Sequence, residues 1–483
     1  MRPALEVADI FRRHGEAYRH AHGAGMGRVE RRVMSAIATC RTAALGGHVE
    51  QCTGCRAIRV SYNSCRNRHC PKCQGLARAE WLEARQAELL PVPYFHVVFT
   101  VPAPIAEIAF QNKAMVYDML FQATAETLRT IAADPEHLGA EIGMLAVLHT
   151  WGQNLQHHPH VHCVVPGGGP SPDGTRWVAA RPCFFLPVRV LSALFRRLFL
   201  ERLRAAFEAD KLRFFGALLD LLQPAVFARR LAAWRRIDWV VYAKRPFGGP
   251  AQVLAYLGRY THRVAIANSR LIQLEEGRVS FRWRDYRQRG KTKVMTLATA
   301  EFIRRFLLHT LPDGFKRIRH YGFLANGHRA AKVALCRRLL AAPAPPTPQP
   351  IDYRERYRRL TGHSLDICPG CGGHMQSLGP ASRRSSRLRM ARHVMTRHRR
   401  SDRLSPLGLT TPSADSHRAA DLAGRVIVTL IVVQASLESP FAVVRRPISR
   451  PLTSRAADLR LTRNPPWRSP SLTPHPAAPI QSP

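Results

Sequence analysis

The sequence predicts an α+β fold in which a sheet is flanked by helices, and three observations lead to this prediction. Stretches rich in aromatic and β-branched residues, typical of strands, alternate with amphipathic stretches at helical spacing through the middle of the chain. A double Cys-x-x-Cys pattern precedes them and indicates a small metal-stabilised domain. From about residue 381 the chain carries many Arg and no Lys, and Pro is crowded near its end, a composition typical of a disordered tail.

The size and charge of the chain favour a multidomain protein with a polyanionic partner. The 483 residues suffice for two or three domains, since a domain usually has ~100–200 residues. Lys and Arg number 73 against 33 Asp and Glu, a formal net charge of +40. Such a charge attracts nucleic-acid backbones. A ribosomal-type protein or a protein of anionic membrane surfaces would share it, so charge alone leaves these classes open.

Neither a membrane span nor a secretory signal is predicted. The longest obvious apolar stretch, residues 426–433, is far shorter than the ~20 residues of a membrane helix. Arg2, Glu6 and Asp9 interrupt the N-terminus, whereas a signal peptide has an uninterrupted apolar segment. We therefore expect a cytoplasmic, nucleoid-associated protein whose eleven cysteines bind metal instead of forming disulfides.

Helices and strands are expected in a mixed order. The N-terminal part contains helices at residues 28–42 and 76–90, and Pro91 and Pro93 end the second one. Strands are expected at residues 94–101, 160–165, 237–242, 278–286 and 293–297. Further helices are expected at residues 106–133, 190–207, 250–263 and 301–308.

These elements divide the chain into five segments. A helical and cysteine-rich domain covers residues 1–90, and a larger α+β domain covers residues 91–335. A proline-rich linker, residues 336–350, leads to a small Cys-x-x-Cys element, residues 351–380. The basic tail, residues 381–483, is expected to be disordered.

The N-terminal cysteine pairs predict a structural zinc site. Cys52 and Cys55 form the first pair, and Cys70 and Cys73 form the second after fourteen intervening residues. Two such pairs supply the four thiolates of a tetrahedral zinc ion, which leaves no open position for catalysis. Other residues nearby could replace one ligand or build a second site; they are Cys40, His48, Cys65 and His69.

A further pair, Cys368 and Cys371, leaves two alternatives open. Only His363 and His374 lie close enough in sequence to complete a shell around it. The pair therefore fits a second zinc knuckle or no metal site equally well.

A histidine pair and a tyrosine pair are the candidate catalytic residues. His160 and His162 alternate along an expected strand, so both imidazoles face one side and can hold one divalent ion. Tyr256 and Tyr260 are four residues apart on an expected helix, so their hydroxyls lie about one turn apart. Either pair alone is also compatible with simple packing. Together in a basic chain they favour a nuclease, because a metal-activated phosphodiester suits attack by a tyrosine hydroxyl.

Six ordered strings also resemble a known family. They are RTAALGGHVEQC, SCRNRHCPKCQ, FHVVFTVP, HTWGQNLQHHPHVHCVVPGGG, AYLGRYTHRVAIAN and RRFLLHTLPDGFKRIRHYGFLAN, between residues 41 and 329. Their sequence resembles the two-tyrosine HUH rolling-circle transposases of the insertion sequence 91 type, which carry an N-terminal transposase zinc-binding domain. After the region of His320 and Tyr321 the similarity fades.

The resemblance implies a metal-dependent single-strand DNA endonuclease and strand transferase that drives rolling-circle transposition of a mobile element. His160 and His162 would hold Mg²⁺ or Mn²⁺. Tyr256 and Tyr260 would attack scissile phosphates and form 5′-phosphotyrosine links, with no need for a nucleotide cofactor. The implied fold is an HUH-type antiparallel sheet with the histidine strand at its centre and the tyrosine helix beside it.

A third metal ligand is also implied, and its identity stays open at this point. The neighbouring candidates are Asn154, Gln156, His157 and His158. A residue on another strand or on the tyrosine helix is an equal alternative.

The basic hairpin at residues 278–297 is the expected DNA-binding element. Cations that follow a backbone and rings that stack on unpaired bases suit single-stranded DNA, although the aromatic residues could instead belong to the core. The residues expected to contact DNA are Arg282, Trp283, Arg284, Arg289 and Lys291.

Three alternatives to a transposase remain. A replication initiator or a relaxase would share the HUH chemistry. A non-catalytic zinc-containing DNA-binding regulator would bind DNA without a covalent adduct, and a decayed element would keep the fold without the activity.

Overall fold

The computed structural model describes residues 5–86, 88–182, 185–247, 264–285, 288, 290–343 and 351–381, together with five positions between 252 and 262. All of them belong to the unit Met1–Ala435. Residues 344–350 of the expected linker and 382–483 of the expected tail lie outside the described residues. Among the described helices, none has the length and apolarity that crossing a bilayer requires.

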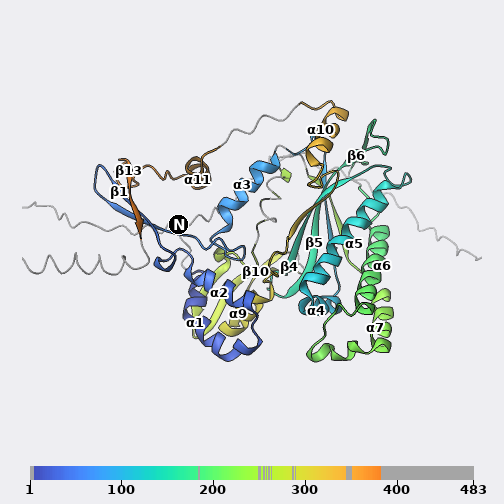
Figure 1. Cartoon of the computed structure of the whole chain (residues 1–483), viewed down its shortest axis with the longest axis horizontal. Helices are drawn as coiled ribbons and strands as arrows, with labels where there is room; N and C mark the ends of the chain where they lie inside the picture. The colour runs from blue at the N-terminus through green and yellow to red at the C-terminus, as the bar shows by residue number, and fades with distance from the viewer. Residues whose placement is uncertain are drawn as a thin grey trace, which may run out of the picture. The chain divides into compact units, whose positions relative to one another are not determined.

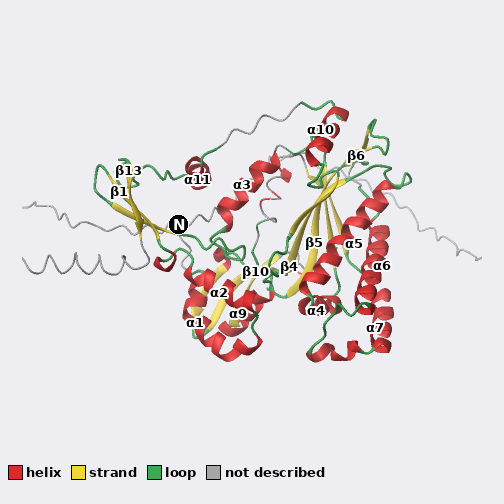
Figure 2. Cartoon of the chain, in the orientation of Figure 1, coloured by secondary structure: helices red, strands yellow, loops and turns green. Residues whose placement is uncertain are grey.

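Helices and strands follow one another in mixed order along the chain. Figure 2 shows where each kind of element lies. The helices are α1 Val7–His22, α2 Arg28–Thr39, α3 Gln74–Gln86, α4 Ala103–Gln111, α5 Lys113–Ala133, α6 Val188–Glu208, α7 Pro224–Arg236, α9 Thr299–Leu308, α10 Arg329–Leu339 and α11 Tyr353–Thr361. The strands are β1 Gly47–Cys52, β2 Ile58–Tyr62, β3 Tyr94–Thr100, β4 Gly143–Trp151, β5 His157–Pro166, β6 Gly168–Pro170, β7 Trp177–Ala179, β8 Val241–Phe247, β9 Leu271–Glu275, β10 Arg278–Asp285, β11 Lys291–Ala298, β12 Ile318–Gly322 and β13 Met375–Ala381.

A five-stranded sheet in the order β12-β4-β5-β3-β8 forms the centre of the described part. Every pair of neighbours in it is antiparallel. The expected α+β class with an antiparallel sheet flanked by helices is therefore confirmed. The strand with the histidine pair, β5, occupies the middle of the sheet, where its side chains are fixed from both sides by β3 and β4.

Side chains alternate between the two faces of this sheet, as pleating requires. One face is apolar, and α5 and α6 lie side by side along it (Figure 1). Its strand residues include Val97, Phe99, Ala146, Leu148, Val161 and Cys163, all 2% exposed or less. The opposite face carries the histidines of the candidate site.

A second core joins the start of the chain to a much later segment. Helices α1 and α2 pack with α9 and the sheet β11-β10-β9. The rings of Phe11 and Phe306 meet edge to face, with centroids 5.3 Å apart. The backbone amide of Val7 donates to the side-chain oxygen of Asn268 at 3.1 Å. The first helices thus share a core with the segment beyond residue 264 and with Cys40 and Cys70.

The small Cys-x-x-Cys element returns to the N-terminal part of the chain. Strand β13 pairs antiparallel with β1, so that a three-stranded sheet β13-β1-β2 forms. Helix α11 lies against α3, where Arg356 forms ion pairs with Glu80 at 3.3 Å and with Glu83 at 3.0 Å.

Some elements differ from their sequence-based expectation. The helix expected over residues 106–133 is two helices, with a break at Asn112, whose side-chain amide donates to the carbonyl oxygen of Arg213 at 2.8 Å. The strand β8 begins at Val241 and not at residue 237. Strand β4 was not expected, because it is buried on both faces and its apolar residues do not alternate with polar ones.

Candidate functional site

Three histidines from two neighbouring strands meet on the face of the sheet opposite α5 and α6. His160 and His162 alternate along β5, and His149 of β4 lies directly opposite His160 in the strand register. Their ligating nitrogen atoms all lie within 4.8 Å of one another. His149 and His162 are buried. Such a set of imidazole nitrogens can hold a divalent ion and leave coordination positions open for a substrate.

Hydrogen bonds orient the rings of this histidine set. Nδ1 of His160 lies 2.6 Å from the carbonyl oxygen of His158. A carbonyl only accepts, so Nδ1 of His160 carries the proton and its Nε2 is left for a metal. Nδ1 of His162 lies 2.8 Å from Nε2 of His96, a buried residue of β3. The histidine set therefore has a supporting partner on a third strand.

Tyr256 approaches this histidine set from the expected tyrosine helix. Its backbone is helical, as it is at positions 252, 253 and 258. Its hydroxyl lies 2.5 Å from Nε2 of His96 and 3.4 Å from Nδ1 of His162. Val253, three residues earlier, is buried in the same apolar cluster and helps to hold the segment against the sheet. The second expected nucleophile, Tyr260, lies outside the described residues.

His96 is uncharged at neutral pH. Burial, together with the nearby Lys244 and His160, lowers the pKa of His96 to about 3. A neutral imidazole keeps one ring nitrogen as a hydrogen-bond acceptor. It can therefore accept a hydrogen bond from the hydroxyl of Tyr256 and hold that hydroxyl in place.

The residues next to the histidine pair in sequence do not complete the set. His157 points to the helical face, where its Nε2 lies 2.7 Å from the hydroxyl of Tyr117. The side-chain amide of Asn154 donates to Gln156 at 2.9 Å. Of the alternatives that the sequence left open, a residue on another strand, His149, is the one the fold brings in.

Sequence reasoning missed His149 and His96. The signal for His149 was a continuous apolar run, residues 143–151, which is typical of a strand buried on both faces. The signal for His96 was a single polar side chain inside an otherwise apolar strand. Neither signal identifies the residues that these histidines contact, because local sequence does not determine which strands pair.

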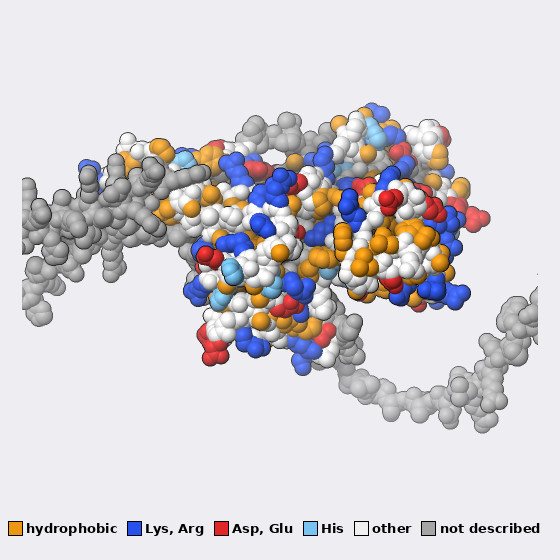
Figure 3. All heavy atoms as spheres, turned by 60° about the horizontal axis from the view of Figure 1, so that its bottom comes forward, with side chains coloured by type: hydrophobic (Ala, Val, Ile, Leu, Met, Phe, Trp, Pro, Cys, Tyr) orange, Lys and Arg blue, Asp and Glu red, His pale blue; other side chains and the backbone are white. Residues whose placement is uncertain are grey.

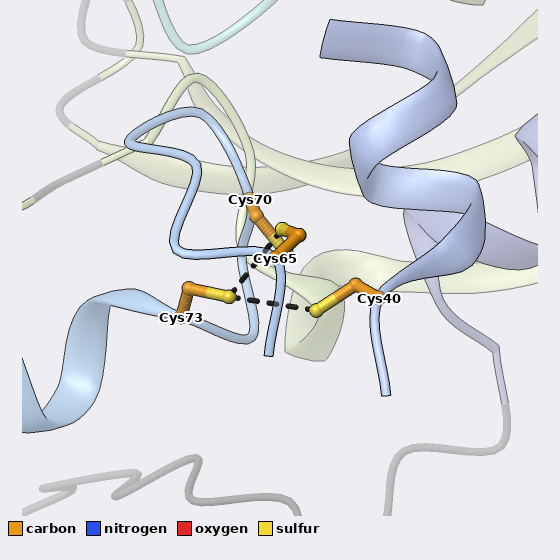
Figure 4. Close-up of side chains that lie close together, drawn as sticks. All are labelled: Cys40, Cys65, Cys70 and Cys73. Carbon is orange, nitrogen blue, oxygen red and sulfur yellow. Dashed lines mark hydrogen bonds between the residues drawn. The ribbon is translucent and has the colours of Figure 1, made fainter. Parts of the chain in front are cut away.

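The single four-cysteine zinc site predicted from the pair spacing is wrong. Cys70 and Cys73 do not meet the first pair; they meet two other cysteines, Cys40 and Cys65 (Figure 4). Sγ of Cys73 lies 3.4 Å from Sγ of Cys40 and 3.5 Å from Sγ of Cys65. We call these four residues the first cysteine cluster.

The other pair, Cys52 and Cys55, meets Cys368 and Cys371 in a second cysteine cluster. The hairpin of β1 and β2 explains the separation. The first pair sits at the turn of this hairpin, and β2 then carries the chain back to its open end. There Cys70 and Cys73 meet Cys40, which directly follows α2.

A buried ion pair fastens the first cysteine cluster to α1. Nζ of Lys72 lies 2.9 Å from a carboxylate oxygen of Glu6, and the two side chains are 3% and 1% exposed. Nζ of Lys72 also donates to the carbonyl oxygen of Cys40 at 3.1 Å. Hydrogen bonding with Cys65 lowers the pKa of Cys40, whereas hydrogen bonding with Cys40 raises the pKa of Cys65 and of Cys70.

The expected basic hairpin exists as β10 paired antiparallel with β11. Arg282, Arg284 and Lys291 are exposed. Phe281 is fully buried in the second core, and Trp283 is half-buried with Nζ of Lys293 5.8 Å from its ring centroid. The cations thus face outward while these rings turn inward. Arg289 lies outside the described residues.

A basic cleft of about 920 Å³ runs from the first cysteine cluster to His262, near the tyrosine segment. Burial and the neighbouring Arg68 lower the pKa of Arg317 to about 10. Cations held this close favour an anionic ligand, because its charge relieves their mutual repulsion. The cationic residues that line the cleft are Arg41, Arg66, Arg68, Lys72, Lys316 and Arg317.

Comparisons with known proteins identify the family of the chain. Residues 143–332 match the family model described as "Putative transposase", and residues 10–101 match the "Transposase zinc-binding domain". The chain is 65% identical over 373 residues to "Putative transposase y4qJ" of Sinorhizobium fredii, covering 77% of this chain and 94% of that protein. It is 29% identical over 314 residues to "Transposase for insertion sequence element IS801" of Pseudomonas savastanoi pv. phaseolicola, covering 62% of this chain and 72% of the relative.

No solved structure matches the chain. The two family models lie in order along the sequence, with the zinc-binding part first and the histidine strand inside the second. The chain belongs to the insertion sequence 91 family of transposases, with an N-terminal zinc-binding domain.

Proposed function

We propose that this transposase nicks and rejoins single-stranded DNA at the ends of a mobile element, with Tyr256 as a nucleophile and a divalent ion held by histidines. The proposal rests above all on one observation: the Tyr256 hydroxyl lies 2.5 Å from His96 and 3.4 Å from His162. The contact brings this hydroxyl to the position at which the histidine set would hold a metal ion.

The donor chemistry of the histidine set fits a divalent ion. His149, His160 and His162 supply nitrogen donors from two rigid strands. Mg²⁺ prefers oxygen ligands, whereas Mn²⁺ accepts imidazole more readily, so these donors favour Mn²⁺ over Mg²⁺. When bound, the ion would polarise a phosphodiester and stabilise charge that develops on its oxygens.

The residues of the chain account for the remaining requirements of the reaction. The Tyr256 oxygen attacks phosphorus, the bond to the 3′ oxygen breaks, and the DNA is left with a 5′-phosphotyrosine link and a free 3′-hydroxyl. The proton that the Tyr256 hydroxyl loses is balanced by the proton that the 3′ oxygen gains, and the hydrogen bond with His96 holds the attacking hydroxyl in position. The phosphotyrosine conserves the energy of the broken bond, so the reverse attack by a 3′-hydroxyl rejoins a strand without a nucleotide cofactor.

Tyr260 is proposed as the second nucleophile, which would take a second strand during transfer. It follows Tyr256 by four residues, a spacing that puts both hydroxyls on one side of a helix. Two tyrosines would allow one strand end to stay attached while another is cut, a requirement of rolling-circle transfer.

Two basic surfaces provide a path for the DNA. The basic cleft leads toward the tyrosine segment, and the exposed cations of the hairpin, Arg282, Arg284 and Lys291, would contact the phosphate backbone. Lys and Arg side chains lie in several groups over the face drawn in Figure 3. Because these contacts go to phosphates, they would add affinity without sequence preference.

The zinc ion of the zinc-binding domain is proposed to lie in the first cysteine cluster. Its four sulfurs come from Cys40, Cys65, Cys70 and Cys73. Four thiolates close the coordination shell, so this ion is structural. It would hold the loop that carries Arg66 and Arg68 at the basic cleft.

The test is incubation of the purified full chain with labelled single-stranded DNA from the element end, plus Mn²⁺ or Mg²⁺, followed by a denaturing gel. We expect a DNA-linked protein band that EDTA abolishes. The band should also disappear with His160→Ala and with the double change Tyr256→Phe and Tyr260→Phe, while both variants still bind the DNA. Binding without any adduct on the cognate end would contradict the proposal and favour a DNA-binding regulator.

A further inference from the structure

The second cysteine cluster has the sulfur geometry of a metal site and not that of disulfides. Sγ of Cys52 lies 3.4 Å from Sγ of Cys371, and Sγ of Cys55 lies 3.7 Å from Sγ of Cys368. A disulfide requires about 2.05 Å. Four sulfurs at about 2.3 Å around a tetrahedral zinc ion lie roughly 3.8 Å from one another. The observed separations are close to this tetrahedral edge.

Both pairs sit on tight turns that aim their sulfurs at one point. The amide of Arg56 donates to the carbonyl oxygen of Cys52 at 3.1 Å, and the amide of Gly372 donates to that of Cys368 at 3.0 Å. The backbone amides of Gly370 and Cys371 also donate hydrogen bonds to the sulfur of Cys368.

Two glycines close the backbone around the sulfurs. A Cβ atom at Gly373 would lie 3.0 Å from Sγ of Cys52 and 3.4 Å from Sγ of Cys371. A Cβ atom at Gly54 would lie 3.6 Å from Sγ of Cys371. Backbone thus lies against the sulfurs of Cys52 and Cys371, and four cysteine ligands would leave a bound zinc ion no open position.

The three-stranded sheet around the cluster has almost no apolar core of its own. In the described part of the chain its buried cluster consists of Cys52, Cys368 and Met375, with Ala57 packed against them. So small a cluster cannot offset the entropy of ordering three strands and a turn. A bound metal is the usual source of the missing stability in modules of this size.

We infer that this second cysteine cluster binds a structural zinc ion, and that the ion fastens the C-terminal element, residues 351–381, onto the N-terminal hairpin of β1 and β2. Cys52 and Cys371 are 319 positions apart, so one ion joins two distant parts of the chain. Cys52 and Met375 are also the last register partners of β1 and β13, which places the ion at the end of that strand pair.

Contacts away from the sulfurs orient the same element. Arg59 of β2 is buried, pairs with Glu50 at 2.7 Å and donates to the carbonyl oxygen of Leu365. The ion pairs of Arg356 with Glu80 and Glu83 connect α11 to α3. These polar contacts set the position of the element, and the ion supplies the stability.

The first experiment counts zinc in the purified full chain by elemental mass spectrometry. Every chain in this experiment, the parent included, carries His160→Ala, so that the histidine set does not add to the zinc count. We expect about two zinc ions per chain, and about one after Cys368→Ser with Cys371→Ser. Cys336→Ala, at a buried cysteine outside both clusters, is the matched control and should keep both ions. A double variant that holds as many zinc ions as the parent chain would overturn the inference.

A second measurement needs no ligand substitution and so does not depend on how the variant folds. The parent chain is alkylated under native conditions, with and without a mild chelator, and the modified cysteines are identified by peptide mass spectrometry. Cys52, Cys55, Cys368 and Cys371 should be protected together and become reactive together, although Cys55 and Cys371 are solvent-exposed. Free reaction of Cys368 and Cys371 in the zinc-loaded chain would contradict a shared ion.

Gly373→Ala provides a third variant, which keeps all four sulfurs. Its added Cβ atom would crowd Sγ of Cys52, so the second ion should be lost to a chelator faster than from the parent chain. Gly327→Ala is the control, since a Cβ atom there meets nothing within 4 Å and neither Gly327 nor Gly373 has a left-handed backbone conformation. Equal rates in the parent chain and Gly373→Ala would show that the glycine does not enclose a metal.

Discussion

The hydroxyl of Tyr256 lies 2.5 Å from Nε2 of His96, although the two residues are 160 positions apart in the sequence. The same nitrogen of His96 lies 2.8 Å from Nδ1 of His162. One buried imidazole thus contacts both the proposed nucleophile and a member of the histidine set. This arrangement makes His96 a positioning residue whose removal should affect the tyrosine more than the metal.

Replacing His96 should slow adduct formation while metal binding persists. His96→Ala removes the hydrogen-bond partner that orients the Tyr256 hydroxyl, and misplacement of a reacting group typically lowers a rate about 10²-fold. Single-turnover adduct formation and Mn²⁺ binding by calorimetry are measured on the same preparation. His96→Gln, which restores an acceptor, should recover part of the rate. A His96→Ala chain with the parent rate would exclude this role.

Replacing His149 should instead weaken metal binding. It supplies one of three nitrogen donors, and even the loss of a residue that only supports a ligand costs about 10–100-fold in affinity. We therefore expect His149→Ala to need at least 100-fold more Mn²⁺ for half-maximal adduct formation, by order of magnitude. His20→Ala, at an exposed histidine of α1, is the control. An unchanged Mn²⁺ requirement in His149→Ala would remove this histidine from the set.

Removing cations from the hairpin should weaken DNA binding in a salt-dependent way. For single strands, each lost phosphate contact reduces the slope of log affinity against log salt by about 0.7. Arg282→Ala with Arg284→Ala should therefore reduce this slope by about 1.4, as measured by fluorescence anisotropy. The control pair is Arg197→Ala with Arg204→Ala, at exposed positions of α6. If both pairs change the slope equally, the hairpin has no special role in binding.

Breaking the buried ion pair of Lys72 and Glu6 should destabilise the N-terminal part of the chain. Lys72→Met leaves the Glu6 carboxylate buried without its cation, which typically costs about 3–5 kcal/mol of unfolding free energy. Adding Glu6→Gln should recover part of this loss, because the uncompensated charge is gone. Urea denaturation of the three chains measures both effects. A double variant less stable than Lys72→Met would show that charge burial is not the cause.

Acidification should destabilise the fold through buried neutral histidines. Burial, with His157 nearby, lowers the pKa of His309 to about 3, whereas an unfolded histidine titrates near 6.5. Above pH ~6.5 both states are neutral. As the pH falls from there toward 3, only the unfolded chain gains the proton, so stability present at neutral pH is lost.

His309→Gln measures this effect directly. Between pH 5 and 6, roughly, the parent chain should lose more unfolding free energy per pH unit than the variant, by up to about 1.4 kcal/mol. Chemical denaturation at several pH values supplies both slopes. His14→Gln, at a half-buried histidine of α1, is the control. Identical slopes for the parent and His309→Gln would mean that His309 does not account for the loss.

Local sequence was sufficient where a feature lies within one element. The strand of His160 and His162 and the helical position of Tyr256 follow from spacing, because a strand repeats every two residues and a helix every 3.6. The basic hairpin followed in the same way from alternation around a turn. The burial of Phe281 could not be predicted in this way, since the helices that cover it come from the start of the chain.

The sequence by itself determined the family, the antiparallel α+β class and the residues that carry the proposed chemistry on β5 and the tyrosine segment. Only the tertiary structure decided which partners they meet. His149 and His96 enter through the register of β4 and β3 with β5, and the cysteine pairs separate because a hairpin holds them apart. The physical reason is that such contacts join residues far apart in the sequence; Cys52 and Cys371, for example, are separated by 319 positions. Strand pairing and core packing bring such residues together, and local sequence does not determine either.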